Sequence, residues 1–184
     1  MGCSGLTELK LPNSLETIGE SAFNRCYGIT AVEIPAKVSY IAESAFWNCD
    51  SVEYYAVKSS NKYYTAIDGN LYTKDKTSLI KYAAANKNTA FVLPKTVVNV
   101  CTFAFQSCKH IEEVTIPNGV RDLVAIFYNC ASLKTVRYEA AVLSASVQYI
   151  ECPALENFIV DPINPVYQSI DGNLYTKDGT ALLR

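Results

Sequence analysis

The sequence has few of the features that mark an active site, a metal centre or a nucleotide-binding loop. It contains one histidine and no Cys-x-x-Cys, His-x-x-x-His or glycine-rich phosphate motif. Zinc sites and phosphate loops depend on such spacings, so neither a metal nor a cofactor is predicted. Glu112 and Glu113 are adjacent, which places them on opposite faces of a strand rather than together as paired carboxylates.

The single histidine, His110, limits nucleophilic catalysis to a pair with a nearby cysteine, Cys108 or Cys101. Cys108 occupies a position that recurs along the chain, which favours a structural role. We expect His110 to be a polar residue in the bend before a strand. A polar pocket around His110 would favour an enzyme, and a solvated His110 would exclude that interpretation.

The chain also lacks an excess of basic charge and a long apolar run. It has 16 Lys and Arg against 18 Asp and Glu, for a formal net charge of −2. Without a basic cluster to neutralise phosphates, neither nucleic acid nor an anionic membrane is an expected partner. No apolar segment is long enough to span a bilayer, and no signal peptide is present. The chain starts and stops inside repeated units, so we expect a fragment of a longer protein, with residues 1–184 as one repeat domain.

What the chain does contain is a repeat of 23 residues. The interval separates several cysteines and prolines: Cys3, Cys26 and Cys49, Pro12 and Pro35, Pro94 and Pro117. A fixed period of this length predicts a solenoid, in which each unit buries its apolar face against the next.

Each unit contains a strand, a turn and a return. Apolar residues two positions apart precede the proline, as in Leu9-x-Leu11-Pro12, which is the spacing of a strand with one buried face. An Ala-Phe-x-x-Cys segment follows at 22–26, 45–49 and 104–108. We expect seven strand rungs with one continuous core, about 30 Å long at the usual strand spacing. They are centred on Leu9/Leu11, Val32/Ile34, Tyr55/Val57, Phe91/Leu93, Val114/Ile116, Val136/Tyr138 and Phe158/Val160.

Seven cysteines permit two interpretations. In a secreted chain they could form disulfides. Recurrence once per turn favours small apolar core residues instead, because stacked parallel side chains rarely have bridging geometry. We expect free, buried thiols.

A second repeat is longer. The segment 64–75 recurs at 167–178, an offset of 103 residues, and predicts two β-insertions at about 58–88 and 161–184. Asp68-Gly69 and Asp171-Gly172 indicate type I′ hairpin turns. Gly179 marks a further turn, where Lys76 stands in the first copy and should introduce strain.

These motifs resemble the BspA-like leucine-rich repeat family of bacterial and protist surface proteins. The resemblance rests on L-x-x-I-x-I-P, A-F-x-x-C and the I-D-G-x-L-Y-x-K-D insertion. It implies an α/β leucine-rich-repeat solenoid that is strand-rich and right-handed. The parallel sheet would lie on the concave side, with short helical or irregular turns on the convex side. The resemblance also implies secretion or cell-surface display, and adhesion to extracellular proteins such as fibronectin and fibrinogen.

Candidate binding residues are those that the repeat does not require. Some alternate with the buried strand residues and should face the concave side, and others are tyrosines near the first insertion. They are Glu8, Lys10, Glu33, Tyr54, Val92, Glu113, Thr115, Arg137 and Asn157, with Tyr63, Tyr64 and Tyr72. Tyrosine suits recognition of protein or sugar, although strand alternation should bury about half of them. Trp47 would be a contact residue if exposed and core if buried.

The sequence therefore predicts a non-enzymatic adhesion module, secreted or on the cell surface, with its signal and anchor outside residues 1–184. The expected partner is a matrix or plasma protein, or a glycan. The alternative is a carbohydrate-binding or scaffolding segment of a larger surface enzyme.

Overall fold

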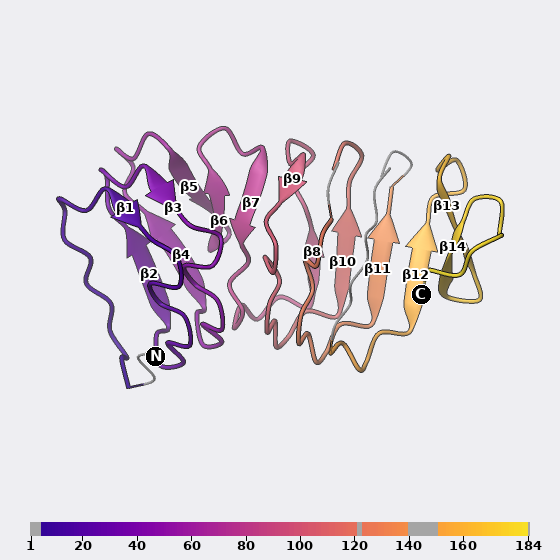
Figure 1. Cartoon of the computed structure of the whole chain (residues 1–184), viewed down its shortest axis with the longest axis horizontal. Coiled ribbons are helices and arrows are strands. Elements are labelled where there is room, and N and C mark those ends of the chain that lie inside the picture. The colour runs from indigo at the N-terminus through magenta and orange to yellow at the C-terminus, as the bar shows by residue number, and fades with distance from the viewer. Residues whose placement is uncertain (1–4, 121–122, 140–150, 184) are drawn as a thin grey trace.

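The computed structural model describes residues 5–120, 123–139 and 151–183, and these form fourteen strands. The chain winds into an elongated coil whose turns follow one another from the N-terminal to the C-terminal end (Figure 1). The strand-rich solenoid predicted from the repeat is confirmed. The described residues contain no helix, so the turns between strands are irregular rather than helical.

One side of the coil carries the parallel strands predicted from the apolar spacing. β2 (Ala31–Ile34) pairs with β4 (Tyr54–Val57). The second group runs in the order β8 (Ala90–Val92), β10 (Glu113–Ile116), β11 (Thr135–Tyr138) and β12 (Asn157–Val160). Equivalent apolar residues stand in register across it, because Val114 pairs with Val136 and Val136 with Phe158. Six of the seven expected rungs are therefore strands.

The prediction of a first rung at Leu9 and Leu11 is wrong. The segment 6–16 contains no strand, and both leucines are half-buried against the core beside β2. A rung inside the stack has a neighbour on each side. Among the described residues, this segment has one neighbour only, so it gains less from burial.

The return side carries shorter strands and the Ala-Phe-x-x-Cys turns. β1 (Thr17–Ile18) pairs with β3 (Tyr40–Ile41), and β9 (Asn99–Val100) pairs with β7 (Ser78–Lys81). Equivalent aromatic rings stack on one another in successive turns. The ring centroids of Phe23 and Phe46 lie 5.4 Å apart, and those of Phe105 and Phe127 lie 5.0 Å apart.

The repeated cysteines are small core residues that form no disulfide. Each of the five that end a described turn is buried, and none is bridged: Cys26, Cys49, Cys108, Cys130 and Cys152. The Cys49 thiol donates to the Phe23 carbonyl at 3.0 Å, and the Cys130 thiol donates to the Phe105 carbonyl at 2.7 Å. Each of these two thiols thus donates a hydrogen bond to a carbonyl of the preceding turn. Cys3 lies outside the described residues.

Both insertions are antiparallel, as predicted. The first contains β5 (Tyr64–Ile67), β6 (Asn70–Thr73) and β7, and the second contains β13 (Tyr167–Ile170) and β14 (Asn173–Thr176). Asp68 and Gly69 have φ of 49° and 76°, the two positive values that a type I′ turn needs. The Gly69 carbonyl accepts from the Tyr55 amide at 2.7 Å, which ties the hairpin tip to the edge of β4.

The first insertion divides the core, so the prediction of one continuous core is wrong. Successive residues of β6 face opposite ways, because side chains alternate along a strand. Leu71 packs with Tyr64 among the residues of the N-terminal half, whereas Tyr72 packs with Leu79 among those of the C-terminal half. The insertion is therefore an internal wall with an apolar face on each side.

A buried asparagine fixes the base of each insertion. The Asn61 side chain is 1% exposed and donates to the carbonyls of Pro35 at 2.7 Å and Val38 at 3.0 Å. Its oxygen accepts from the amides of Tyr63 and Tyr64, both at 2.8 Å.

Asn164 stands 103 residues later and has the same role. It is fully buried, and its oxygen accepts from the amides of Val166 and Tyr167 at 2.8 Å.

Substituting Asn61 by alanine tests this anchor. The change removes four hydrogen bonds from a buried site, so we expect the free energy of unfolding to fall by about 2–4 kcal/mol. Urea denaturation measures the change. Asn88→Ala, at an exposed position, should stay within about 0.5 kcal/mol of the wild type. Equal stability of the two variants would contradict the anchor role of Asn61.

The second turn of each insertion offers a matched pair of substitutions. Lys76 has φ of 63° where Gly179 has φ of 71°, so both copies build the same turn and only one has glycine. Left-handed backbone costs a non-glycine residue about 1–2 kcal/mol. Lys76→Gly should therefore raise the free energy of unfolding by about 1 kcal/mol, and Gly179→Lys should lower it by a similar amount. A loss of stability in Lys76→Gly would show that the turn is not strained.

Candidate functional site: the outward face of the parallel sheet

The outward residues of β8, β10, β11 and β12 form two straight rows across the sheet. The strand register places Val92, Thr115, Arg137 and Ile159 in one row. The second row contains Ala90, Glu113, Thr135 and Asn157. Val92 is 62% exposed and Ile159 is 38% exposed, so the first row has an apolar side chain open to solvent at each end. We call these eight residues the sheet face.

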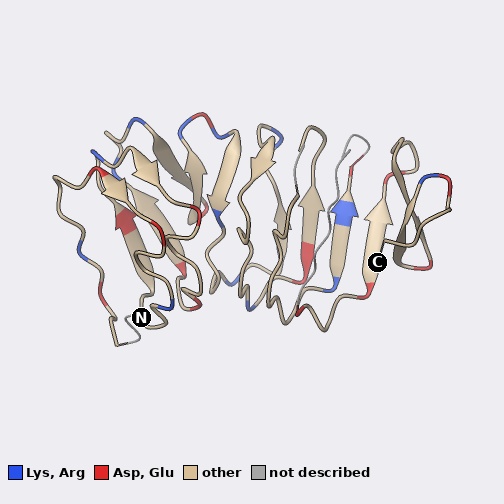
Figure 2. Cartoon of the chain, viewed as in Figure 1, with Lys and Arg blue, Asp and Glu red and all other residues tan. Residues whose placement is uncertain are grey.

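An ion pair lies in the middle of the sheet face. The Arg137 Nε lies 2.6 Å from one carboxylate oxygen of Glu113, and Nη2 lies 3.4 Å from the other. In Figure 2 the acidic colour on β10 and the basic colour on β11 lie on neighbouring strands. Both side chains are about 40% exposed, so the pair adds little to stability. Its effect is to hold the guanidinium group in one orientation, in a row where Thr115 and Ile159 are the neighbours of Arg137.

A smaller outward surface lies on β2 and β4. Lys58 Nζ lies 2.8 Å from the Glu33 carboxylate, and both side chains are about half exposed. Tyr54 is 50% exposed and stands over the hairpin tip. A Cβ at Gly69 would lie 3.0 Å from the Tyr54 Cβ, so glycine permits this close approach. The first insertion separates this surface from the sheet face, because no pairing joins β4 to β8 among the described strands.

The structure groups some of the predicted binding residues and separates others. Seven lie on the two outward surfaces: Glu33, Tyr54, Val92, Glu113, Thr115, Arg137 and Asn157. Glu8 and Lys10 are exposed, but they lie in the segment that forms no strand. Their expected place on the sheet is therefore not found.

The tyrosines of the first insertion divide between surface and core. Tyr63 is 52% exposed, whereas Tyr64 and Tyr72 are 7% and 1% exposed. The Tyr64 hydroxyl accepts from the Ile41 amide at 2.9 Å, and Tyr72 packs in the C-terminal half of the core. Both buried tyrosines hold the insertion in place, and neither presents a surface to a ligand.

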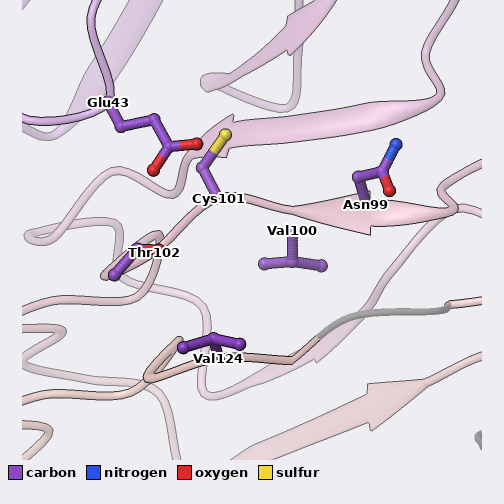
Figure 3. A pocket seen from close by; sticks show the side chains of 6 residues that line it. All are labelled: Glu43, Asn99, Val100, Cys101, Thr102 and Val124. Carbon is purple, nitrogen blue, oxygen red and sulfur yellow. The ribbon is translucent and has the colours of Figure 1, made fainter. Parts of the chain in front are cut away.

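A hollow of about 400 Å³ on the return side was not predicted from the sequence. Its lining includes Glu43, Asn99, Cys101 and Val124, and Figure 3 shows the Cys101 sulfur directed toward the Glu43 carboxylate. Burial, with the nearby carboxylate, raises the pKa of Cys101 to about 12. The thiol therefore stays protonated at neutral pH and is a poor nucleophile.

Trp47 is half-buried. Its ring packs edge-to-face on Phe103 at 5.2 Å, and its remaining surface faces a second hollow with Tyr40 and Glu20. Tyr40 is 55% exposed. Trp47 thus belongs partly to the core and partly to an aromatic and acidic surface.

The groups considered for catalysis differ in exposure. His110 is exposed, whereas Cys108 is 1% exposed. Lys81 is 4% exposed and its pKa is lowered to about 8 by burial; its amine donates to the Phe103 carbonyl at 2.7 Å. That contact gives Lys81 a structural role where the first insertion meets the next turn.

Within residues 5–120, 123–139 and 151–183, no group of three His, Cys, Asp or Glu is placed to hold a metal ion. The same residues contain no helix that could cross a membrane.

Comparison with known structures supports the fold. A leucine-rich repeat protein from Eubacterium ventriosum is similar over 83% of this chain, with 29% identity and a TM-score of 0.76. The pneumococcal vaccine antigen PcpA is similar in fold over 84% of the chain, with 17% identity and a TM-score of 0.62. The chain spans 41% and 51% of the length of these two structures. Comparison with curated proteins gives no match.

The family comparison covers most of the sequence. The model described as the BspA type leucine-rich repeat region matches residues 1–86 and 77–175, with six copies of the repeat. The matched residues include the strand rungs, the Ala-Phe-x-x-Cys turns and the first insertion described above. The chain therefore belongs to the BspA-type leucine-rich repeat family.

Proposed function

We propose that this protein is a non-enzymatic adhesion module of a secreted or cell-surface protein, and that the sheet face binds an extracellular protein. The observation that carries the proposal is the arrangement of the sheet face, where exposed Val92 on β8 and Ile159 on β12 lie on either side of the Arg137–Glu113 pair of β10 and β11. The partner class is a matrix or plasma protein.

The chemistry of the sheet face suits a protein partner. Solenoid proteins bind partners through extended sheet surfaces. Interfaces concentrate their binding energy in a few apolar and arginine side chains surrounded by polar residues. Val92, Ile159 and Arg137 supply such side chains, and Thr115 and Asn157 supply polar neighbours. Because the strands hold these residues in register, binding requires little ordering of the main chain.

A surface location is supported by the family resemblance rather than by any feature of the described residues. The family resembled is one of bacterial and protist surface proteins. The free thiols are compatible with this location because all but Cys101 among the described cysteines are buried.

Glycan binding is a second candidate function, and the return side favours it. The hollow that contains Tyr40, Trp47 and Glu20 combines aromatic rings with a carboxylate. Aromatic rings pack against sugars, and carboxylates accept hydrogen bonds from hydroxyl groups. This candidate agrees with the alternative of a carbohydrate-binding segment of a larger surface enzyme.

One array experiment separates these functions. The wild type is tested against immobilised matrix proteins, plasma proteins, mucins and glycans, together with Val92→Asp, Ile159→Asp and Tyr40→Ala. All three positions are exposed, so the variants should fold. We expect binding to a protein that falls at least about tenfold in the two aspartate variants, because each places a charge in the contact. Tyr40→Ala should bind as the wild type does.

The opposite pattern would support the glycan site: binding to a glycan that Tyr40→Ala alone reduces. An array on which the wild type binds nothing would contradict both functions.

A further inference from the structure

The end of β7 packs at the place where the turns 45–49 and 104–108 meet. On either side of this place, main-chain amides of one turn donate to main-chain carbonyls of the next. Here the Tyr82 amide, directly after β7, donates to the Ala104 carbonyl at 2.9 Å instead. Side chains therefore supply part of the contact between the two turns, and we call this place the joint.

The side chain of Gln106 bridges the two turns of the joint. Its Oε1 accepts from the Asn48 amide at 2.8 Å, and its Nε2 donates to the Asn48 side-chain oxygen at 3.1 Å. Gln106 is 5% exposed, and the repeat does not require it, because Trp47 and Tyr128 occupy the same position in their turns. The carboxamide is thus held in one orientation inside the joint, with its carbonyl polarised by a main-chain N–H.

The amine of Lys81 lies beside this carboxamide. Lys81 is the last residue of β7 and is 4% exposed, and its Nζ lies 3.5 Å from the Gln106 Oε1. The hydrogen bond from Nζ to the Phe103 carbonyl keeps the amine in this position. Burial lowers the pKa of Lys81 to about 8, so a fraction of the amine is unprotonated at neutral pH. A desolvated, unprotonated lysine is a nucleophile.

A carboxylate lies close to the same amine. Asp50 follows the first turn of the joint and interacts electrostatically with Lys81. Its Oδ1 is buried and has no hydrogen-bond partner among the described residues. A buried oxygen of this kind is costly to leave unpaired, and it can accept a proton from a neighbouring amine.

We propose that Lys81 and Gln106 form an intramolecular isopeptide bond, so that the joint is a site of self-modification. The unprotonated Nζ attacks the Gln106 carbonyl carbon, and the Nζ–Cδ bond forms while the Asn48 amide stabilises the charge on Oε1. Asp50 accepts a proton from Nζ and passes it to Nε2. The Cδ–Nε2 bond then breaks and ammonia leaves, so the reaction needs no oxidant and no second reactant.

The product removes a buried ionisable group from the joint. A protonated lysine is costly in a desolvated site, whereas a secondary amide is neutral and keeps its carbonyl for the Asn48 amide. The bond also closes a loop of main chain from residue 81 to residue 106. Such a link stabilises chiefly by restricting the unfolded chain, as a disulfide does, but reducing agents do not break it.

Mass spectrometry of the intact wild type tests the proposal. We expect a mass about 17 Da below that of the unreacted chain, because attack of the amine on the carboxamide releases one ammonia. Trypsin does not cleave after a lysine whose amine is acylated. The digest should therefore contain a branched peptide in which residues 77–87 are joined to residues 96–109.

Four substitutions identify the reacting groups. Lys81→Met removes the nucleophile and Gln106→Met removes the carboxamide, so each variant should keep the mass of its unreacted chain. Asp50→Asn keeps both reacting groups and should slow the loss of ammonia at least about tenfold, because the proton acceptor is absent. Lys109→Met, at an exposed position, is the control and should lose ammonia as the wild type does. Circular dichroism verifies that each variant folds.

A wild type that keeps the mass of the unreacted chain after prolonged incubation would overturn the proposal, whether or not any variant folds. Loss of ammonia that persists in Lys81→Met would also overturn it, since another carboxamide would then be its source. The same holds for a digest in which residues 77–81 appear as a free peptide in full amount. Binding on the sheet face involves other residues, so its outcome does not bear on this test.

Discussion

The structure depends on the contact between each repeated unit and the next. A single unit has one strand, one turn and a few apolar side chains, and it cannot bury them alone. In the stack, Val114, Val136 and Phe158 cover one another on the sheet side, and the rings of Phe105 and Phe127 do so on the return side. Sulfur-to-carbonyl contacts such as that from Cys130 to Phe105 satisfy main-chain groups between turns. The repeated residues are therefore needed to stabilise the fold. For this reason we assign binding to residues whose identity the repeat does not determine.

The insertions modify this scheme without breaking it. Each leaves the stack at a buried asparagine, forms a hairpin and returns its turn carbonyl to the edge of the parallel sheet. The first is covered on both faces and so becomes a wall between two halves of the core. In the second, Tyr167 and Leu174 are buried as the equivalent Tyr64 and Leu71 are in the first, so the inner face is kept.

Much of the fold could be predicted from the sequence because the repeat sets the register of the rungs. The type I′ turns followed from Asp68-Gly69 and Asp171-Gly172, which provide two adjacent positive-φ positions. The role of Asn61 was missed, although Asn164 repeats it at an offset of 103 residues, because the apolar pattern that predicts burial does not identify a buried asparagine. The burial of Tyr64 and Tyr72, and the division of the core, depend on which face of an insertion meets which turn. Alternation within a strand cannot give that information when both faces are covered. The sheet face was predicted as a set of alternating residues, but its central ion pair required the registration of β10 with β11.

Each unit is stabilised by its neighbours, and the first insertion separates two halves of the core. Native-state hydrogen exchange on Leu133→Ala measures this directly, because Leu133 is fully buried in the C-terminal half. We expect faster exchange of the amides in β10, β11 and β12, with those of β2 and β4 unchanged. An equal loss of protection in all five strands would contradict it and would show that the two halves unfold as one core.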